Sequence, residues 1–241
     1  MVNGECESGT EPITGFVLAG GASRRFGRNK ALAEIAGEAL ISRLCKVLRR
    51  VTSSVEIIGA SETYSQFGVT CIADRWPGEG PLGGIITALM SGAERGRIEE
   101  PAGMPPGRHG KPALPDGDRL GPRGVNAWNL IIGSDMPFLT REWLAYLAQR
   151  AMASNAEVVV PRSEHGLEPL CACWRTSAVA SLARSFEGGV RRVTDAMKQP
   201  SMEVLDVADW KRFDSAGRLF WNMNTPSDYE EAKRILQSER T

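Results

Sequence analysis

The sequence predicts a mixed α/β fold, a single-domain three-layer sandwich with helices on both faces of a mostly parallel central sheet. Short runs rich in Val and Ile alternate along the chain with segments of helical periodicity, which is the pattern of strand–helix–strand units. The chain has 241 residues, of which 42% are hydrophobic. A domain of this size can bury a full hydrophobic core.

The first half of the chain begins with a strand over residues 13–19. Residues 40–51 repeat apolar side chains every three or four positions, as one face of an amphipathic helix does. Pro81 is favoured at the first position of a helix and opens the helix predicted over 81–95. The other strands predicted in this half cover residues 55–60 and 68–74.

The second half begins with the largely apolar run 128–135, which suits a central strand. Thr140 is placed to cap the helix predicted over 141–153, because its hydroxyl can accept a hydrogen bond from the first turn. A last strand is expected to end at Asn224 and Thr225. The remaining predicted elements are strands over 156–161 and 168–174 and a helix from about Pro226.

Residues 96–126 interrupt this alternation. They are crowded with Pro and Gly and have no apolar periodicity, and a structureless loop of that length is uncommon inside a compact domain. The segment is either a domain linker or a surface insertion. Because the strand pattern continues after it without a new start, we favour a mobile surface insertion within a single domain spanning 1–241. Residues 1–12 of that span are expected to form a disordered N-terminus.

Charge and cysteine content exclude several classes of protein. Lys plus Arg and Asp plus Glu are equal at 29 each, so no general basic field predicts binding to nucleic acid. No apolar stretch approaches the ~20 residues of a membrane span. The five cysteines form neither a CxxC pair nor a dense framework, which predicts a reducing cytoplasm. Cys171 and Cys173 fall on one face of a predicted strand, where we expect burial rather than metal binding.

The stretch LAGGASRRFGRNKAL, residues 18–32, follows the first predicted strand. Open α/β sheets bind ligands at the carboxyl ends of their strands. Gly20 and Gly21 let backbone N–H groups approach a phosphate closely, while Arg24, Arg25 and Lys30 supply positive charge. The loop has neither Walker A nor GxGxxG spacing. It predicts a polyphosphate-binding loop, although a surface turn with solvated arginines would have the same composition.

Three further stretches favour a nucleotide site. DRWPGEGPLGGI (74–85) places a carboxylate at a strand end and then a Gly-rich turn that opens a helix. GSDMPF (133–138) ends a buried strand with Asp135, whose carboxylate suits a divalent metal on a triphosphate. WNMNTPSDY (221–229) carries Thr225, for which helix capping is a sufficient explanation.

Together, LAGGASRRFGRNKAL, GPLGGI, SDMPF and NMNTP resemble the motifs of the molybdenum cofactor guanylyltransferases, which attach GMP to molybdopterin. The resemblance runs in order from about residue 14 to residue 236, apart from the insertion. The first loop alone would indicate only the wider superfamily of nucleotidyltransferases with a Rossmann-like fold. The resemblance implies such a fold, GTP and molybdopterin (molybdenum cofactor) as substrates, Mg²⁺ as cofactor, and transient contact with molybdenum-insertion or cofactor-delivery proteins.

The resemblance also implies the roles of individual residues. Lys30 matches the residue that binds the nucleotide's phosphates, and Asp135 matches the Mg²⁺ ligand; both, with Arg25, are the implied catalytic residues. Asp74 matches a residue of nucleoside recognition. The stretch 189–193 resembles a segment near the pterin. The other nucleotide- or cofactor-binding positions implied are Leu18, Ala19, Gly20, Gly21, Gly80, Pro81, Leu82, Arg191, Arg192, Asn222 and Asn224.

One departure from the family pattern is Gly59, which stands where relatives often carry Asn. One contact to guanosine is therefore expected to be missing or to be made by the backbone. The alternatives are a cytidylyltransferase for the same cofactor, a sugar-phosphate nucleotidyltransferase, and a non-catalytic nucleotide-binding or cofactor-chaperone module. The presence of both Lys30 and Asp135 favours an enzyme. A protein that binds a nucleotide without catalysing a reaction has less need of a carboxylate that holds a metal ion.

Overall fold

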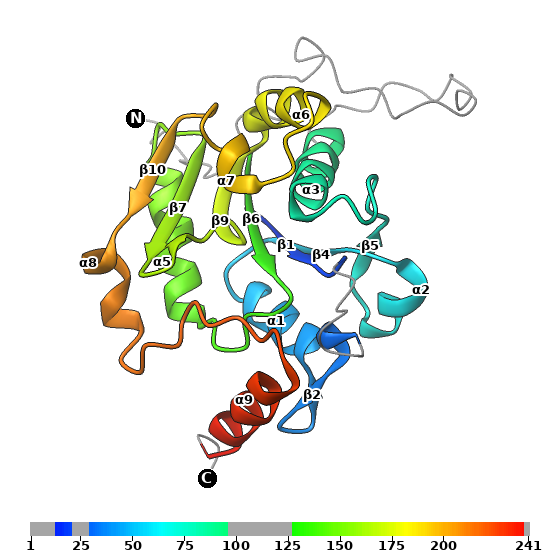
Figure 1. Cartoon of the computed structure of the whole chain (residues 1–241), viewed down its shortest axis with the longest axis vertical. Coiled ribbons are helices and arrows are strands. Elements are labelled where there is room, and N and C mark those ends of the chain that lie inside the picture. The colour runs from blue at the N-terminus through cyan, green and yellow to red at the C-terminus, as the bar shows by residue number, and fades with distance from the viewer. Residues whose placement is uncertain (1–12, 21–28, 96–126, 239–241) are drawn as a thin grey trace, which may run out of the picture.

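A central β-sheet runs through the computed structural model, which describes residues 13–20, 29–95 and 127–238 (Figure 1). Among these residues the sheet has eight strands in the order β10-β7-β9-β6-β1-β4-β5, with β8 paired to β7. The predictions made for residues 1–12 and 96–126 lie outside the described residues. The strands are β1 (Thr14–Leu18), β4 (Ser54–Ile58), β5 (Thr70–Ile72), β6 (Trp128–Gly133), β7 (Val158–Ser163), β8 (Gly166–Leu167), β9 (Cys171–Arg175) and β10 (Met202–Leu205).

The sheet is mostly parallel, as predicted. β1 runs parallel to both of its neighbours, β4 and β6, and the pairs β4–β5 and β7–β10 are also parallel. β9 is antiparallel to β6 and β7. The predicted strand over 168–174 therefore exists as β9, but it runs against the direction of its two neighbours, β6 and β7.

Helices cover both faces of the sheet and give the predicted three layers (Figure 1). Alternate residues of each strand face opposite sides. Val17 of β1 packs in a hydrophobic cluster with α1 (Leu40–Leu48) and α5 (Arg141–Ala153), whereas Phe16 packs in a second cluster with α3 (Pro81–Arg95) and α6 (Val179–Glu187). The sheet thus separates two hydrophobic cores.

The remaining helices and turns complete the described part of the chain. Among the described residues, no helix is both long and apolar enough to cross a membrane. The helices not yet given are α2 (Ser61–Tyr64), α7 (Val193–Ala196), α8 (Val207–Trp210) and α9 (Pro226–Ser238), with 3₁₀ turns at η1 (Lys30–Leu32), η2 (Ser65–Phe67), η4 (Thr176–Ala178) and η5 (Lys211–Phe213).

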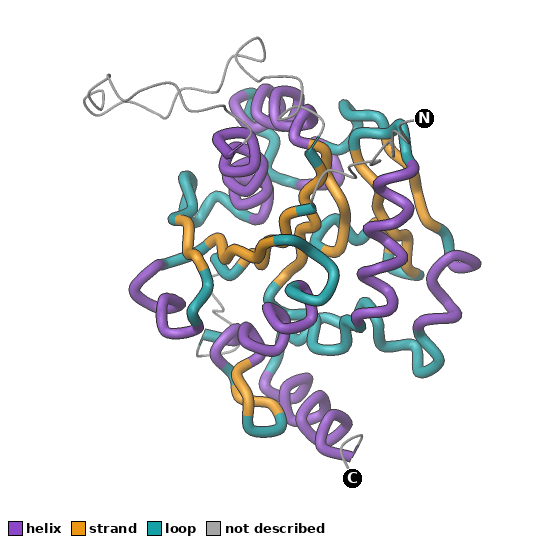
Figure 2. Tube along the Cα trace, turned by 180° about the vertical axis from the view of Figure 1, so that it is seen from behind, coloured by secondary structure: helices purple, strands orange, loops and turns teal. Residues whose placement is uncertain are grey.

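The C-terminal helix α9 lies beside a small hairpin formed by β2 (Glu34–Ile35) and β3 (Glu38–Ala39), as Figures 1 and 2 both show. The Tyr229 hydroxyl of α9 donates a hydrogen bond of 2.7 Å to the carbonyl of Glu34. The hairpin follows η1 directly. The contact therefore brings the end of the chain close to the segment that follows the first loop.

Several local predictions are confirmed. The helix predicted over 81–95 is α3, and Thr140 caps α5 by accepting a hydrogen bond of 3.3 Å from the N–H of Trp143. Cys171 and Cys173 are both fully buried. Burial raises the pKa of the Cys171 thiol to about 12, so it stays protonated at neutral pH.

The prediction of a last strand that ends at Asn224 and Thr225 is wrong. Residues 221–225 have no regular secondary structure, and the last strand among the described residues is β10, which the sequence did not predict. The Asp214 carboxylate accepts hydrogen bonds from two backbone N–H groups just before this segment. The Met223 N–H donates to the carbonyl of Asp135 at 2.8 Å. These contacts provide hydrogen-bond partners for backbone N–H groups that would otherwise pair with a neighbouring strand.

Candidate active site

A cleft opens at the carboxyl ends of the central strands. The chain leaves β1 toward β4 and β5 on one side and returns on the other side as β6, so the order of strands reverses at β1. Such a reversal is where open α/β sheets hold ligands. The cavity of about 220 Å³ is sized for part of a small molecule. It is lined by Leu18, Ala19, Gly20, Asn29, Lys30, Ile58, Asp74, Gly80, Pro81, Gly84, Gly133, Ser134, Asp135 and Leu170.

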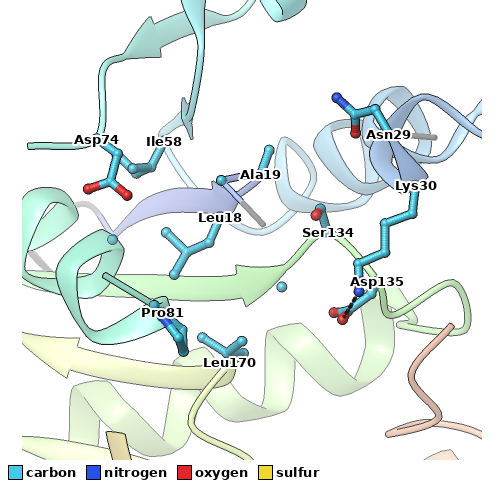
Figure 3. A pocket seen from close by; sticks show the side chains of 14 residues that line it. Leu18, Ala19, Asn29, Lys30, Ile58, Asp74, Pro81, Ser134, Asp135 and Leu170 are labelled. Carbon is cyan, nitrogen blue, oxygen red and sulfur yellow. Dashed lines mark hydrogen bonds and ion pairs between the residues drawn. The ribbon is translucent and has the colours of Figure 1, made fainter. Parts of the chain in front are cut away.

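Lys30 and Asp135 form an ion pair at one end of this cleft (Figure 3). The Lys30 ammonium lies 2.7 Å from the Asp135 carboxylate, and the two side chains are 17% and 18% exposed. Lys30 begins η1, whereas Asp135 follows β6. Since both side chains are largely removed from water, the ion pair offsets part of the cost of burying the two charges.

Asn224 joins this pair from the C-terminal part of the chain. Its side-chain Oδ1 accepts a hydrogen bond of 3.2 Å from the Lys30 ammonium. The Asp228 carboxylate, in the first turn of α9, accepts hydrogen bonds of 2.8 Å from the backbone N–H groups of Asn224 and Thr225. Slight burial raises the pKa of Asp228, but these hydrogen bonds outweigh it and hold the pKa below its ordinary value.

Asp74 lies at the other end of the cleft, with Leu18 and Ala19 between it and the ion pair (Figure 3). One of its carboxylate oxygens, Oδ1, accepts a hydrogen bond of 3.0 Å from the Trp76 N–H and lies 3.3 Å from the Thr87 hydroxyl. The other, Oδ2, faces Gly20, where an added Cβ would lie 3.5 Å away. The carboxylate is thus fixed through one oxygen and presents the other toward the cleft.

The N-terminus of α3 also borders the cleft. Gly80 precedes the helix with φ +91°, a left-handed conformation that favours glycine. A Cβ on Gly84 would lie 3.4 Å from the Leu18 side chain, so glycine here lets the helix approach β1 closely. The first N–H groups of a helix have no partner within it and attract anions. The Leu82 side chain is fully buried in the core, and only its backbone is available to a ligand.

Three of the remaining residues implied by the resemblance, Arg191, Arg192 and Asn222, are not among the described residues that line the cleft. The Arg191 guanidinium pairs with Glu79 at 2.6 Å and lies 4.0 Å from the Phe186 ring centre. The Arg191 backbone carbonyl is near Gly80, where an added Cβ would lie 4.0 Å from its oxygen. Arg192 is exposed and precedes α7. Asn222 donates to the carbonyl of Phe220. Gly21 and Arg25 lie outside the described residues.

Sequence reasoning missed several residues that line the cleft. Asn29 and Ser134 stand next to predicted site residues inside the quoted motifs, so the signal to include them was present. Leu170 comes from the turn before β9. Its place in the cleft depends on the antiparallel course of β9, which the apolar pattern alone does not reveal.

The donor set of the cleft fits a magnesium ion that is bound together with a polyphosphate. Among the described residues, no three His, Cys, Asp or Glu side chains gather as a metal site. Mg²⁺ is usually held by only one or two carboxylates, with phosphate oxygens of the substrate and water completing its shell. A single carboxylate, Asp135, next to the Lys30 ammonium matches that arrangement.

The sheet with its reversal at β1 and the cleft with a Lys–Asp pair define an α/β nucleotidyltransferase. Residues 15–201 match the family described as MobA-like NTP transferase domain. The chain belongs to this family.

Similar proteins come from several bacteria and an archaeon. The chain is 28% identical over 229 residues to a probable molybdenum cofactor guanylyltransferase of Pelotomaculum thermopropionicum, covering 95% of each chain. It is 28% identical over 238 residues to a molybdenum cofactor guanylyltransferase of Rhizobium leguminosarum bv. trifolii, covering 98% of this chain and 99% of the other. The structure of the molybdopterin-guanine dinucleotide biosynthesis protein A of Archaeoglobus fulgidus superposes with a TM-score of 0.72 at 22% identity, over 94% of this chain and 100% of the other.

Proposed function

We propose that the protein transfers GMP from GTP to the terminal phosphate of molybdopterin and releases pyrophosphate. The observation that carries the proposal is the Lys30–Asp135 ion pair, which lies across one cleft from the Asp74 carboxylate. Such a cleft offers charge for a triphosphate at one end and a hydrogen-bond acceptor for a nucleoside at the other. The names of the two bacterial relatives support guanylyl transfer to the molybdenum cofactor.

The nucleotide occupies the cleft in this proposal. Asp74 recognises the nucleoside through Oδ2, and the ammonium of Lys30 binds the phosphates. Lys30 donates hydrogen bonds to Asp135 and Asn224, and its ammonium carries the positive charge that attracts the phosphates. The backbone of the first loop and of the α3 N-terminus completes the site through Leu18, Ala19, Gly20, Gly21, Gly80, Pro81 and Leu82.

The reaction is an in-line displacement at phosphorus. An oxygen of the molybdopterin phosphate bonds to the α-phosphorus of GTP while the bond from that phosphorus to the bridging oxygen of the β-phosphate breaks. The attacking phosphate is already ionised at neutral pH, so the protein needs no general base. Lys30 and Arg25 reduce the repulsion between the two anions and align them. Asp135 would hold Mg²⁺, which supplies further positive charge to the phosphates.

The acceptor binds beside the glycine turn of α3 in this proposal. Arg192 is exposed and provides a cation for the pterin phosphate, while Asn222 and Asn224 provide amide groups. Arg191 contributes differently, since its pairing with Glu79 steadies the turn that carries Gly80. We assign it to the shape of the site rather than to direct contact with phosphate.

A competition assay tests the proposed function. Guanine presents N1–H and N2–H donors on one edge, which a carboxylate and backbone carbonyls can accept, whereas cytosine has no such paired donors. A site built for those donors leaves buried acceptors unpaired when it binds cytosine. With equal GTP, CTP and a molybdopterin source, we expect at least ~100-fold higher kcat/KM for GTP, measured from the dinucleotides formed.

Three results would contradict the proposal. A mainly cytidylated product would make the protein a cytidylyltransferase for the same cofactor. Pyrophosphate release with a sugar 1-phosphate in place of molybdopterin would identify a sugar-phosphate nucleotidyltransferase. GTP binding without pyrophosphate release from any acceptor would indicate a non-catalytic module.

A further inference from the structure

The buried Tyr64 side chain contacts two residues that line the cleft. Tyr64 ends α2 and is 2% exposed. Its hydroxyl donates a hydrogen bond of 2.9 Å to the carbonyl of Ala19, just after β1. The same hydroxyl accepts a hydrogen bond of 2.9 Å from the side-chain amide of Asn29. Both Ala19 and Asn29 line the cleft.

Asn29 extends this network to the residue that carries the positive charge. Its other side-chain atom, Oδ1, accepts a hydrogen bond of 3.1 Å from the Ala31 N–H and so caps η1, which begins at Lys30. A chain of hydrogen bonds therefore runs from Ala19 through Tyr64 and Asn29 to the turn that holds Lys30. Burial raises the pKa of Tyr64, so its hydroxyl remains a protonated donor at neutral pH.

Gly59 is matched to this position of the tyrosine ring. A Cβ added to Gly59 would lie 2.9 Å from Cε2 and 3.2 Å from Cδ2 of Tyr64. The first distance is shorter than carbon atoms tolerate, so any larger residue at 59 would push the ring away from Ala19. The departure from the family pattern at Gly59 thus has a physical reason, since the Tyr64 ring fills the space next to it.

We propose that Tyr64 is a positioning residue for the nucleoside triphosphate, fixing the end of β1 and the start of η1 relative to each other. The proposal rests on the proposed function in one respect, the nature of the ligand. The network contacts Ala19 and the turn that begins at Lys30. Among the described residues, no hydrogen bond joins Tyr64 or Asn29 to Arg192, Asn222 or Asn224, the residues proposed to bind the acceptor. Tyr64 therefore controls the affinity for GTP and leaves the affinity for the acceptor unchanged.

The test compares Tyr64→Phe with Tyr146→Phe. The Tyr146 hydroxyl also makes two hydrogen bonds, to Asp209 at 3.1 Å and from Arg150 at 2.9 Å, and it does not line the cleft. Each variant loses one hydroxyl and two hydrogen bonds. We expect Tyr64→Phe to weaken GTP binding about tenfold by titration calorimetry without acceptor and to raise the KM for GTP similarly. The KM for the acceptor should change less than twofold, and Tyr146→Phe should leave both values unchanged.

A second variant covers the case in which Tyr64→Phe folds poorly. Asn29→Ser keeps an oxygen that can cap η1 but removes the amide that reaches Tyr64. It should also weaken GTP binding, and combining it with Tyr64→Phe should cost less than the sum of the two single effects. GTP affinity equal to that of the wild type in both single variants would overturn the inference, as would an equal rise in KM for both substrates.

Failure of the proposed function would look different. A wild-type protein that binds GTP but forms no dinucleotide would contradict guanylyl transfer, while the binding comparison would still decide the role of Tyr64. A wild-type protein that binds no nucleoside triphosphate would overturn both.

Discussion

At the scale of single residues, the Lys30–Asp135 pair links binding and stability in one contact. The two side chains are mostly shielded from water and lie 2.7 Å apart, so a substitution that removes the hydrogen bond together with the charge should destabilise the fold. Substitutions here need a replacement that preserves the hydrogen bond if catalysis is to be tested apart from folding. Asparagine at position 135 meets this condition, because its amide oxygen can still accept a hydrogen bond from Lys30.

We expect Asp135→Asn to lower kcat at least ~100-fold with little change in Tm. The amide keeps the shape of the side chain but loses the negative charge that would hold a divalent cation, and metal assistance is worth several kcal/mol. Pyrophosphate release and thermal unfolding measure the two quantities. The matched control is Asp209→Asn, which makes the same change at a carboxylate that contacts Arg150. We expect this variant to keep the kcat of the wild type. Near wild-type turnover in Asp135→Asn would remove the metal assignment.

At the scale of elements, the start of α9 both caps a helix and positions a site residue. The Thr225 hydroxyl accepts a hydrogen bond of 3.2 Å from the Asp228 N–H, and the Asp228 carboxylate accepts one from the Thr225 N–H. This reciprocal arrangement is a capping box, so the expectation that Thr225 caps the helix is confirmed. The same carboxylate holds the backbone of Asn224, whose side chain contacts Lys30.

The lowered pKa of Asp228 predicts the pH dependence of this cap. A carboxyl group whose folded pKa lies below its ordinary value of 3.8 stabilises the fold above that pH and loses its effect as the pH falls through the folded value. Asp228→Ala should therefore lower the free energy of unfolding by about 1 kcal/mol at pH 7. The difference from the wild type should shrink progressively below about pH 3.8. Urea unfolding at pH 7 and pH 3 measures both, and an equal difference at the two pH values would contradict the prediction.

At the scale of the whole molecule, the fold leaves the choice of nucleotide open. One fold can carry many activities, because function depends on the side chains and loops placed on it. We therefore seek selectivity for a base in the side chains and loops at the edge of the sheet, which the competition between GTP and CTP tests.

The single-domain organisation makes a prediction about residues 96–126. The elements on either side are anchored by contacts of their own, since α3 packs in one of the two cores and the Ala127 carbonyl accepts a hydrogen bond from the Thr176 N–H. Replacing residues 97–125 with a short Gly/Ser linker should preserve the fold and basal nucleotide transfer. Thermal unfolding and pyrophosphate release are the measurements. A large fall in Tm would show that the segment packs on the body of the protein.

The sequence by itself determined the elements whose signals are local. β1, α3, β6 and α5 could be predicted because strand and helix periodicity, Pro81 and the Thr140 cap all act within a few residues. The carboxyl ends of parallel strands share one edge, so the motifs also predicted that Asp135 and the first loop border the same cleft. That part of the site could be predicted because each motif directly follows its own strand and can be recognised from neighbouring residues.

Only the tertiary structure decided which distant groups meet. Periodicity reports that a strand is buried but not its direction, so the antiparallel course of β9 and the position of Leu170 could not be predicted. The contact of Lys30 with Asn224 and that of Tyr64 with Ala19 join residues far apart in the sequence. Such contacts form only because packing of the two cores brings their backbones together, and hydrogen bonds then select among the partners within reach.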